Sequence, residues 1–277
     1  MVAAGIVLYN PEWGRLKENI NSVFPQVDML VLVDNGSDNI CEVESYCTKY
    51  PEQIVLIKNN KNEGIAKALN QIIEFCSKKG AEWVLTLDQD SVCSDNFIKQ
   101  MLPYTRRDNI GIICPAVCDR NDKYGKKYNS EIDYVPLCIT SGSLINTEIW
   151  ERIGGYDEKM FIDMVDFEYC MRLKKEGFVI VRVNSACLLH ECGRLKVVKI
   201  GGRFIQVYNH SPLRCFYYAR NIVYCHRKLP DVFSAMQMRK MLFEKFVKVI
   251  VFEENKKDKV SNIISGIQAG KRMKITE

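Results

Sequence analysis

The first half of the chain alternates short, continuously apolar runs with segments whose apolar residues recur at helical spacing. The apolar runs Ala3–Tyr9, Met29–Val33, Ile54–Ile57 and Trp83–Leu87 predict four strands. The intervening segments predict helices, and Gly64–Lys78 has the clearest pattern of them. Strands that are apolar throughout are buried on both faces, and helices between them imply parallel neighbours. The pattern therefore predicts an α/β domain built on a parallel sheet.

The second half is less regular but continues the same alternation. We expect strands at Ile110–Val117, Leu137–Ile145, Phe178–Val183 and Ala186–Leu189, and helices at Asp166–Lys175, Ser211–Lys228 and Met236–Phe252. Asp119–Asp133 is polar and contains glycine, so it predicts a loop. We divide the chain into a main domain, residues 1–230, and a C-terminal helical extension, residues 231–277.

The helix expected over Met236–Phe252 has an apolar face that needs a partner. Phe243, Phe246, Val247 and Ile250 share that face, and lysines lie elsewhere on the helix. Three partners are compatible with it: the main domain, a second copy of the chain in a homodimer, or an anionic membrane surface.

Composition narrows the class of protein without naming a function. The 277 residues are 47% hydrophobic and 26% charged, as is usual for a globular protein with a large core. The net charge of +5 is too small and too dispersed to indicate a nucleic-acid partner. An apolar run follows Met1 with no basic segment before it, so we expect a strand there, not a signal peptide, and a cytoplasmic protein. The twelve cysteines are scattered through apolar segments, and we expect them to be reduced.

Two carboxylates follow the fourth strand directly, in Asp88-Gln89-Asp90. Charges at the end of a buried strand are costly unless they have a partner, and carboxylate oxygens are natural ligands of Mg²⁺ or Mn²⁺. In open α/β sheets, ligands bind at this end of the strands. The pattern fits a divalent cation that holds a phosphate, and it also fits an acidic solvated loop.

Two further strand ends carry polar residues. Asp34 ends the second strand and precedes a turn, so its carboxylate can accept from a base or a ribose hydroxyl, or it can simply stabilise the turn. Asn62 and Gly64 precede the helix that follows the third strand. The backbone N–H groups there can bind phosphate, or Asn62 can cap them.

Taken together, these segments resemble the family-2 glycosyltransferases of GT-A fold, and most of all their bacterial rhamnosyltransferase branch. The resemblance covers residues 3 to 228. It rests on Val7–Pro11, Val33–Ser37, Asn62–Asn70, Leu87–Ser91, Thr140–Ser143, Phe161–Glu168 and Tyr217–Asn221. It implies a nucleotide-diphospho-sugar transferase fold with a mixed, mostly parallel central sheet flanked by helices, followed by the C-terminal helical extension.

The resemblance also implies roles for residues on the donor side. Tyr9 and Asn10 would line the nucleobase pocket, and Asp34 would contact the base edge. Asp88 would bind the ribose or a metal-bound water, and Asp90 would ligate Mn²⁺ or Mg²⁺.

His190 would complete the metal or diphosphate site, and Arg220 would contact the diphosphate. The alternatives are a structural histidine and an arginine packed over tyrosines. Cys187, His190 and Cys192 do not have the spacing of a closed zinc site.

Asp166 matches the general base of the family, and Asp163 is the second candidate. The two are three residues apart and share a helix face if the helix has already begun, although carboxylates are also common at helix starts for their effect on the dipole. Ser141 and Gly142 would form the acceptor-side loop, or a simple tight turn.

The implied activity is a metal-dependent, inverting transfer of a sugar from a dTDP- or UDP-sugar, with dTDP-L-rhamnose as the favoured donor. The acceptor would be a bacterial cell-surface glycan, free or lipid-linked, at the inner face of the plasma membrane. Two other classes stay open: a metal-dependent nucleotidyltransferase, and a non-catalytic nucleotide- or glycan-binding module.

Overall fold

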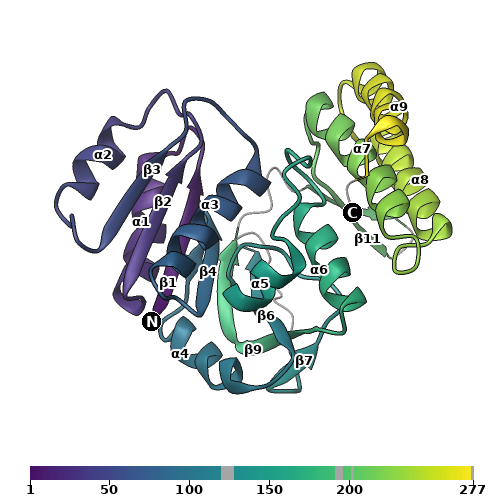
Figure 1. Cartoon of the computed structure of the whole chain (residues 1–277). Helices are drawn as coiled ribbons and strands as arrows, with labels where there is room; N and C mark the ends of the chain where they lie inside the picture. Colours follow the sequence, from purple (N-terminus) through teal and green to yellow (C-terminus); the bar gives the residue numbers. More distant parts are fainter. Residues whose placement is uncertain (120–127, 191–195, 201–202, 276–277) are drawn as a thin grey trace.

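A computed structural model describes residues 1–119, 128–190, 196–200 and 203–275 (Figure 1). Its main sheet has the strand order β3-β2-β1-β4-β8-β6-β9-β5, and β7 pairs with β9. The strands are β1 (Val2–Leu8), β2 (Met29–Asp34), β3 (Ile54–Lys58), β4 (Trp83–Asp88), β5 (Val92–Cys93), β6 (Ile110–Asp119), β7 (Ile132–Tyr134), β8 (Ser143–Asn146) and β9 (Val179–His190). A separate hairpin joins β10 (Lys196–Ile200) and β11 (Arg203–Val207).

The predicted α/β architecture is confirmed. Strands β1 to β4 are parallel, and β8 then runs antiparallel to both β4 and β6. The helices are α1 (Trp13–Val23), α2 (Cys41–Cys47), α3 (Ile65–Lys78), α4 (Phe97–Met101), α5 (Thr147–Ile153), α6 (Val165–Lys175), α7 (Pro212–Lys228), α8 (Ala235–Phe252) and α9 (Lys256–Arg272). Short 3₁₀ turns cover Phe24–Gln26 and Leu102–Arg106.

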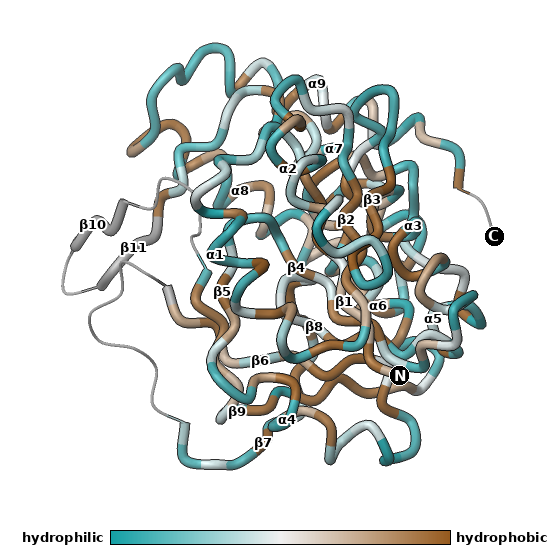
Figure 2. The backbone as a smooth tube through the Cα atoms, turned by 90° about the vertical axis from the view of Figure 1, so that its left-hand side faces the viewer, coloured by the Kyte–Doolittle hydropathy of each residue, from teal (hydrophilic) through white to brown (hydrophobic). Residues whose placement is uncertain are grey.

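The parallel strands are buried on both faces, as their apolar runs predict. Side chains of β1 alternate between two cores, with Ala3 and Val7 in one and Ile6 and Leu8 in the other. Helix α3 covers the first face and α1 the second. In Figure 2 the strands form the hydrophobic centre of the molecule, and hydrophilic segments surround them.

Two strand predictions need correction. Leu137–Ile145 is not one strand: β8 begins only at Ser143, because Gly142 has φ +79° and turns the chain before it. The segments Phe178–Val183 and Ala186–Leu189 form a single strand, β9. Its pairing with β6 skips residues 184–186, since Pro115 pairs with Val183 and Ala116 with Cys187. Most of the predicted loop Asp119–Asp133 lies outside the described residues.

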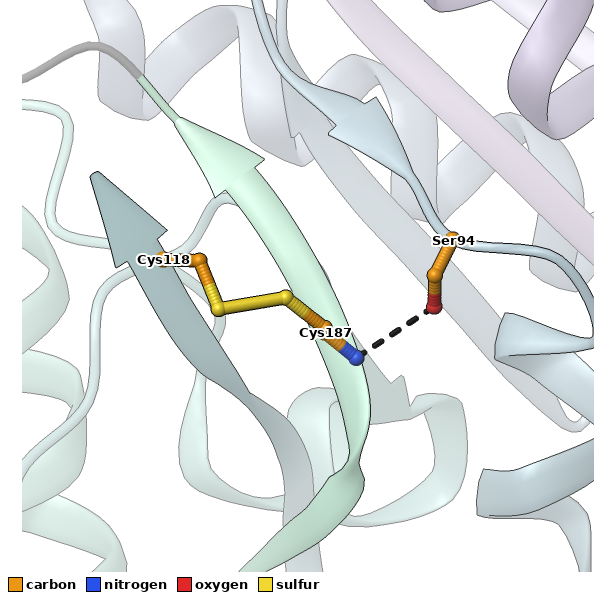
Figure 3. The surroundings of a disulfide bond; sticks show 3 residues. All are labelled: Ser94, Cys118 and Cys187. Atoms are coloured by element: carbon orange, nitrogen blue, oxygen red, sulfur yellow. Dashed lines mark hydrogen bonds between the residues drawn. A yellow bond between two sulfur atoms is a disulfide. The ribbon is translucent and has the colours of Figure 1, made fainter. Parts of the chain in front are cut away.

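The expectation that all cysteines are reduced is wrong for one pair. Cys118 on β6 and Cys187 on β9 form a disulfide, with their Cα atoms 6.4 Å apart (Figure 3). The two strands are hydrogen-bonded neighbours, so the pairing of the sheet places these residues within reach of each other. The Cys187 amide also donates to Ser94 Oγ at 3.3 Å.

Helices α7, α8 and α9 pack on one another at the end of the molecule opposite β2 and β3 (Figure 1). Helix α9 lies against α7, and two glycines of α9 allow the close approach. A Cβ atom on Gly266 would lie 2.3 Å from the Phe216 carbonyl oxygen, and one on Gly270 would lie 2.4 Å from the Arg220 carbonyl oxygen. No helix in the described ranges is both long and apolar enough to cross a bilayer.

A buried ionic cluster joins the C-terminal helices to the segment before α7. Glu253 accepts hydrogen bonds from Lys245 at 3.0 Å and from Lys259 at 2.9 Å, and all three residues are buried. Lys259 also donates to the side chain of Asn209 at 2.5 Å. Each charged group of the cluster therefore has a hydrogen-bonded partner, as burial requires.

We predict that Gly266→Ala lowers the melting temperature. Alanine raises helix propensity by about 1 kcal/mol, but its Cβ would collide with the Phe216 carbonyl and force α7 and α9 apart. Overpacking of this kind costs about 1–3 kcal/mol. Thermal unfolding of Gly266→Ala is compared with that of a separate control variant, Gln268→Ala, at an exposed position of the same helix. The difference between the two melting temperatures measures the cost of the close contact. A Gly266→Ala protein more stable than the wild type would contradict the close contact.

Candidate active site

Three strand ends meet at one edge of the sheet, as the sequence predicts. In the register of the sheet, Leu8 pairs with Asp34 on one side of β1, and Val7 pairs with Asp88 on the other. Asp34 and Asp88 are thus separated by a single strand, or roughly 10 Å. The loops that follow β1, β2 and β4 therefore border one site.

Hydrogen bonds tie these loops together. The Asn10 amide donates to Ser37 Oγ at 2.8 Å, and the Asp38 amide donates to Asn10 Oδ1 at 2.9 Å. The Tyr9 amide donates to Gln89 Oε1 at 2.9 Å, which connects the β1 and β4 loops. The Tyr9 residue is 49% exposed, so its ring is open to a ligand.

Asp34 is buried, and the Ser37 amide donates to its Oδ1 at 3.1 Å. This contact is the turn-stabilising role considered above. It leaves Asp34 at the sheet edge beside Asn10, where the nucleobase contact was expected.

The loop before α3 is organised by Asn35, whose importance the sequence analysis missed. Asn35 is buried; its Nδ2 donates to Asn62 Oδ1 at 3.0 Å, and its Oδ1 accepts from the Glu63 amide at 3.0 Å. Asn62 Oδ1 also accepts from the Gly64 amide at 3.0 Å, and the Ile65 amide donates to the Phe161 carbonyl at 2.8 Å. Two backbone donors at the start of α3 are thus engaged within the protein, as in the capping alternative.

The Asp88–Asp90 segment lies against His190. Strand β5 pairs with the end of β9, which brings the ring beside the two carboxylates. Nε2 of His190 is 3.9 Å from Asp88 Oδ2, and Nδ1 is 3.9 Å from Asp90 Oδ1. Ser91 Oγ is hydrogen-bonded to Nδ1 at 2.9 Å, which fixes the ring and leaves Nε2 for a ligand.

Ser141 and Gly142 lie beneath this segment. Ser141 is buried, accepts from the Asp88 amide at 3.0 Å, and its Oγ lies 2.7 Å from Ser91 Oγ. The Gly142 amide donates to the Thr86 carbonyl at 2.7 Å. The two residues thus form the tight turn considered above, and this turn supports the Asp88–Ser91 loop from below.

The residues present fit a hard divalent cation. The side chains of Asp88 and Asp90 are 41% and 38% exposed, and that of His190 is 12% exposed. Two carboxylates around one oriented imidazole suit Mn²⁺ or Mg²⁺. Within the described part of the chain, no three His, Cys, Asp or Glu side chains already form a metal site. Cys187 is in a disulfide, and Cys192 lies outside the described residues.

Asp166 lies in the first turn of α6 and has an unusual pKa. It faces a small pocket that Thr140, Ser143 and Tyr156 also line. Burial raises the pKa of the Asp166 carboxyl to about 7, and the charges of Asp88 and Asp163 add to this rise. Asp166 is therefore within electrostatic range of Asp88.

Burial likewise raises the pKa of the Asp88 carboxyl. The positive charges of His190 and Arg214 oppose this rise, and the charge of Asp90 increases it.

Asp163 is differently placed from Asp166. Arg214, in the first turn of α7, donates to both of its carboxylate oxygens, from Nη2 at 2.5 Å and from Nε at 3.3 Å. The hydrogen bonds of Arg220 go to other groups. Arg220 donates to Asn221 Oδ1 at 2.9 Å and to the Lys159 carbonyl at 2.8 Å. Arg220 was predicted from the sequence as a site residue, whereas Arg214 was not. A cation in the first turn of a helix opposes the helix dipole, and that signal points to an acidic partner.

The loops that follow the parallel strands β1, β2 and β4 thus gather polar and acidic side chains at the sheet edge where open α/β sheets bind ligands. Residues 4–168 match the family described as Glycosyl transferase family 2. The chain belongs to this glycosyltransferase family and has the GT-A fold.

Two curated proteins and two solved structures extend the comparison. The chain is 32% identical over 257 residues to the dTDP-rhamnosyl transferase RfbF of Shigella flexneri, covering 82% of this chain and 80% of that protein. It is 23% identical over 206 residues to the low-salt glycan biosynthesis hexosyltransferase Agl10 of Haloferax volcanii, covering 67% and 66% of the two chains.

Among solved structures, GalNAc-T7 with UDP, GalNAc and Mn²⁺ superposes with a TM-score of 0.63 at 15% identity, over 97% of this chain but only 56% of that longer chain. S. aureus TarS with UDP-GlcNAc gives a TM-score of 0.62 at 14% identity, over 97% and 81% of the two chains. At these identities the structures confirm the fold alone.

We predict that Asp166→Asn stabilises the protein at neutral and alkaline pH. In the unfolded chain this carboxyl has a pKa of about 4, whereas in the folded protein it is about 7. Between these values the unfolded chain releases the proton first, so stability falls as pH rises and the loss is complete above pH 7. The variant should therefore melt a few degrees above the wild type at pH 8 and show a smaller gain at pH 5.

Asp163→Asn provides the contrast, because it breaks the ion pair with Arg214 and should lower the melting temperature at both pH values. An Asp166→Asn gain that is equal at pH 5 and pH 8 would show that the carboxyl does not titrate in this range.

Proposed function

We propose that the chain is an inverting, metal-dependent glycosyltransferase that moves L-rhamnose from dTDP-L-rhamnose to a hydroxyl of a bacterial cell-surface glycan. The observation that carries this proposal is the Asp166 carboxyl, whose pKa of about 7 is set partly by the charge of Asp88 in the same site. A base and a nucleotide-diphosphate site must share a cleft for direct transfer. The likeness to a dTDP-rhamnosyl transferase supports the choice of donor.

Asp166 is the general base. The acceptor oxygen forms a bond to the anomeric carbon as its proton passes to Asp166, and the bond from that carbon to the β-phosphate oxygen breaks. The electron pair of the broken bond stays on the nucleoside diphosphate. Attack from the face opposite the leaving group inverts the configuration at the anomeric carbon. A base with a pKa near the working pH suits such a step, because it is available as carboxylate and still accepts a proton readily.

A divalent cation, Mn²⁺ or Mg²⁺, would be held by Asp90 and His190, with Asp88 beside it. Bound there, it supplies electrostatic stabilisation of the leaving diphosphate. Ser91 keeps Nε2 of His190 free for this role through its bond to Nδ1. Two neighbouring structures of the same fold contain Mn²⁺, GalNAc-T7 and the mannosyltransferase PcManGT of Pyrobaculum calidifontis.

The nucleoside lies over the β1 and β2 loops in this proposal. Tyr9 offers an exposed ring for stacking, Asn10 lines the pocket, and Asp34 contacts the base edge. Asn62 and Gly64 shape the wall formed by the start of α3. Ser141 and Gly142 act from below the site, and the acceptor enters above them beside Asp166.

A donor screen tests the function. Purified protein is given dTDP-L-rhamnose, other dTDP-sugars and UDP-sugars with a lipid-linked bacterial glycan, and nucleotide release is measured with and without Mn²⁺. We expect dTDP from dTDP-L-rhamnose, with dependence on Mn²⁺. Release of pyrophosphate would indicate a nucleotidyltransferase, and binding without turnover would indicate a binding module.

Two variants assign the roles in the same assay. Asp166→Asn should lower turnover by about 10²–10⁴-fold, the usual contribution of a positioned base, and leave dTDP affinity nearly unchanged. Asp90→Ala should instead lose the dTDP affinity that depends on Mn²⁺. An active Asp166→Asn protein would move the role of base away from Asp166.

We also propose that α8 docks on the anionic inner face of the plasma membrane, where a lipid-linked acceptor lies. Met236, Phe243, Val247 and Ile250 are 80%, 70%, 39% and 50% exposed and fall on one face of the helix. Residues 235–277 hold ten Lys and Arg residues and five Asp and Glu residues, and so carry the whole net charge of +5. An apolar stripe within a basic segment fits anionic lipid better than it fits a second copy of the same surface.

Co-sedimentation with phosphatidylglycerol vesicles tests this docking. The wild type should bind, and binding should weaken at high salt and in the double variant Phe243→Ser, Ile250→Ser. Tyr134→Ser removes an equally exposed aromatic residue on β7 and should bind like the wild type. The opposite result is a dimer that forms at any salt concentration, does not bind the vesicles and dissociates in the double variant. It would assign the apolar face of α8 to self-association instead.

A further inference from the structure

Arg214 occupies a position in the site that the donor chemistry described so far does not use. It lies in the first turn of α7, a helix capped by Ser211, whose Oγ accepts from the Arg214 amide at 3.3 Å. Its guanidinium forms a bidentate ion pair with the Asp163 carboxylate. The Asp163 side chain is 9% exposed and that of Arg214 is 41% exposed. One edge of the guanidinium is thus held by the protein while much of the side chain remains open to solvent.

The turn that carries Asp163 is held by α7. Asp163 and the next residue, Met164, both have φ of +66°, a conformation that costs non-glycine residues about 1–2 kcal/mol each. Asn221 offsets this cost: it is fully buried, and its Nδ2 donates to the carbonyls of Ile162 at 2.9 Å and of Asp163 at 2.7 Å. The same turn leads into α6. Helix α7 therefore also fixes the start of α6, whose first turn carries Asp166.

Charge links Arg214 to the donor side of the site as well. Burial by itself lowers the pKa of the Arg214 guanidinium, but its hydrogen bonds to Asp163 and the charges of Asp163 and Asp88 raise it above its ordinary value. Arg214 is therefore within electrostatic range of Asp88 as well as of Asp163. A nucleoside diphosphate that binds beside Asp88 adds negative charge to a site that already has four carboxylates.

We propose that Arg214 is a donor-binding residue whose guanidinium donates to the diphosphate oxygens of the nucleotide-sugar, while its ion pair with Asp163 holds it in position. A planar guanidinium can bind a carboxylate on one edge and phosphate oxygens with its remaining N–H groups. As the bond to the sugar breaks, charge grows on the β-phosphate, and Arg214 stabilises it. Asp163 is then a positioning residue, which leaves Asp166 as the base. This inference rests on the proposed function.

The contacts of Arg220 show why the two arginines of α7 differ. Arg220 lies 4.6 Å from the centre of the Tyr217 ring and donates within its own surroundings to Asn221 and the Lys159 carbonyl. Its hydrogen bonds join α7 to the segment before Asp163. It supports the turn, whereas Arg214 meets the carboxylates.

Calorimetric titration with dTDP and dTMP, each with Mn²⁺, tests the role of Arg214. The two ligands differ by the phosphate that Arg214 is proposed to bind. Arg214→Ala should weaken dTDP binding by about 10–100-fold, the range for charge-assisted hydrogen bonds, and weaken dTMP binding much less. Arg214→Lys keeps the positive charge but loses the planar guanidinium with its several N–H donors. Its dTDP affinity should therefore fall between those of Arg214→Ala and the wild type.

Two further variants separate ligand binding from support of the fold. Asp163→Asn breaks the ion pair but keeps the guanidinium, so its loss of dTDP affinity should be smaller than that of Arg214→Ala. Arg227→Ala removes one positive charge from the far end of α7, where Arg227 donates to the carbonyls of Gly270 and Met273, and should bind dTDP as the wild type does.

The outcomes distinguish this inference from the proposed function. Equal losses for dTDP and dTMP in Arg214→Ala, or equal dTDP losses in Arg214→Ala and Asp163→Asn, would make Arg214 a structural residue and overturn the inference alone. A wild-type protein that binds no nucleoside diphosphate with Mn²⁺ would overturn both.

Discussion

The burial of carboxylates close to one another at one sheet edge is the constraint on which the rest of this site depends. Asp88 and Asp90 arrive from β4, and Asp163 and Asp166 arrive from the start of α6. Burial and mutual repulsion raise the pKa of Asp166 to about 7 and also raise that of Asp88. A protein tolerates this destabilisation where the charges have a task, and here it yields a carboxyl, that of Asp166, which is half ionised near neutral pH.

The cations around these carboxylates divide the site into parts with different chemistry. Arg214 forms an ion pair with Asp163. His190 lies between Asp88 and Asp90, where a divalent ion would also lie. Within the described part of the chain, Asp166 forms no ion pair with Lys or Arg, and the Phe167 amide donates to its Oδ1 at 2.9 Å. Four similar side chains thereby acquire separate roles through their neighbours.

The parts of this arrangement that sequence could predict are those encoded locally. Runs such as Met29–Val33 are apolar because a parallel strand is covered on both faces, and the polar residue that ends each run then marks the sheet edge. The acidic partner of Arg214 could not be identified in this way, because Asp163 lies 51 positions earlier in the chain. Asn35 was read as part of a turn, since nothing nearby in sequence shows that it binds the loop before α3.

The bounds of helix α9, within the predicted helical extension, could not be predicted for a related reason. Most of its residues are polar, and its buried positions include Gly266 and Gly270, which no hydrophobic pattern marks. These glycines matter because the backbone of α7 lies against them.

The C-terminal helices α8 and α9 are therefore connected to the candidate site through α7. The predicted boundary between residues 230 and 231 separates α7 from helices that pack directly on it, so it does not mark a unit that moves freely. Glu253, with Lys245 and Lys259, fixes α8 and α9 to Asn209, two residues before the cap of α7. Helix α7 in turn carries Arg214 and Asn221, which hold the strained turn at Asp163.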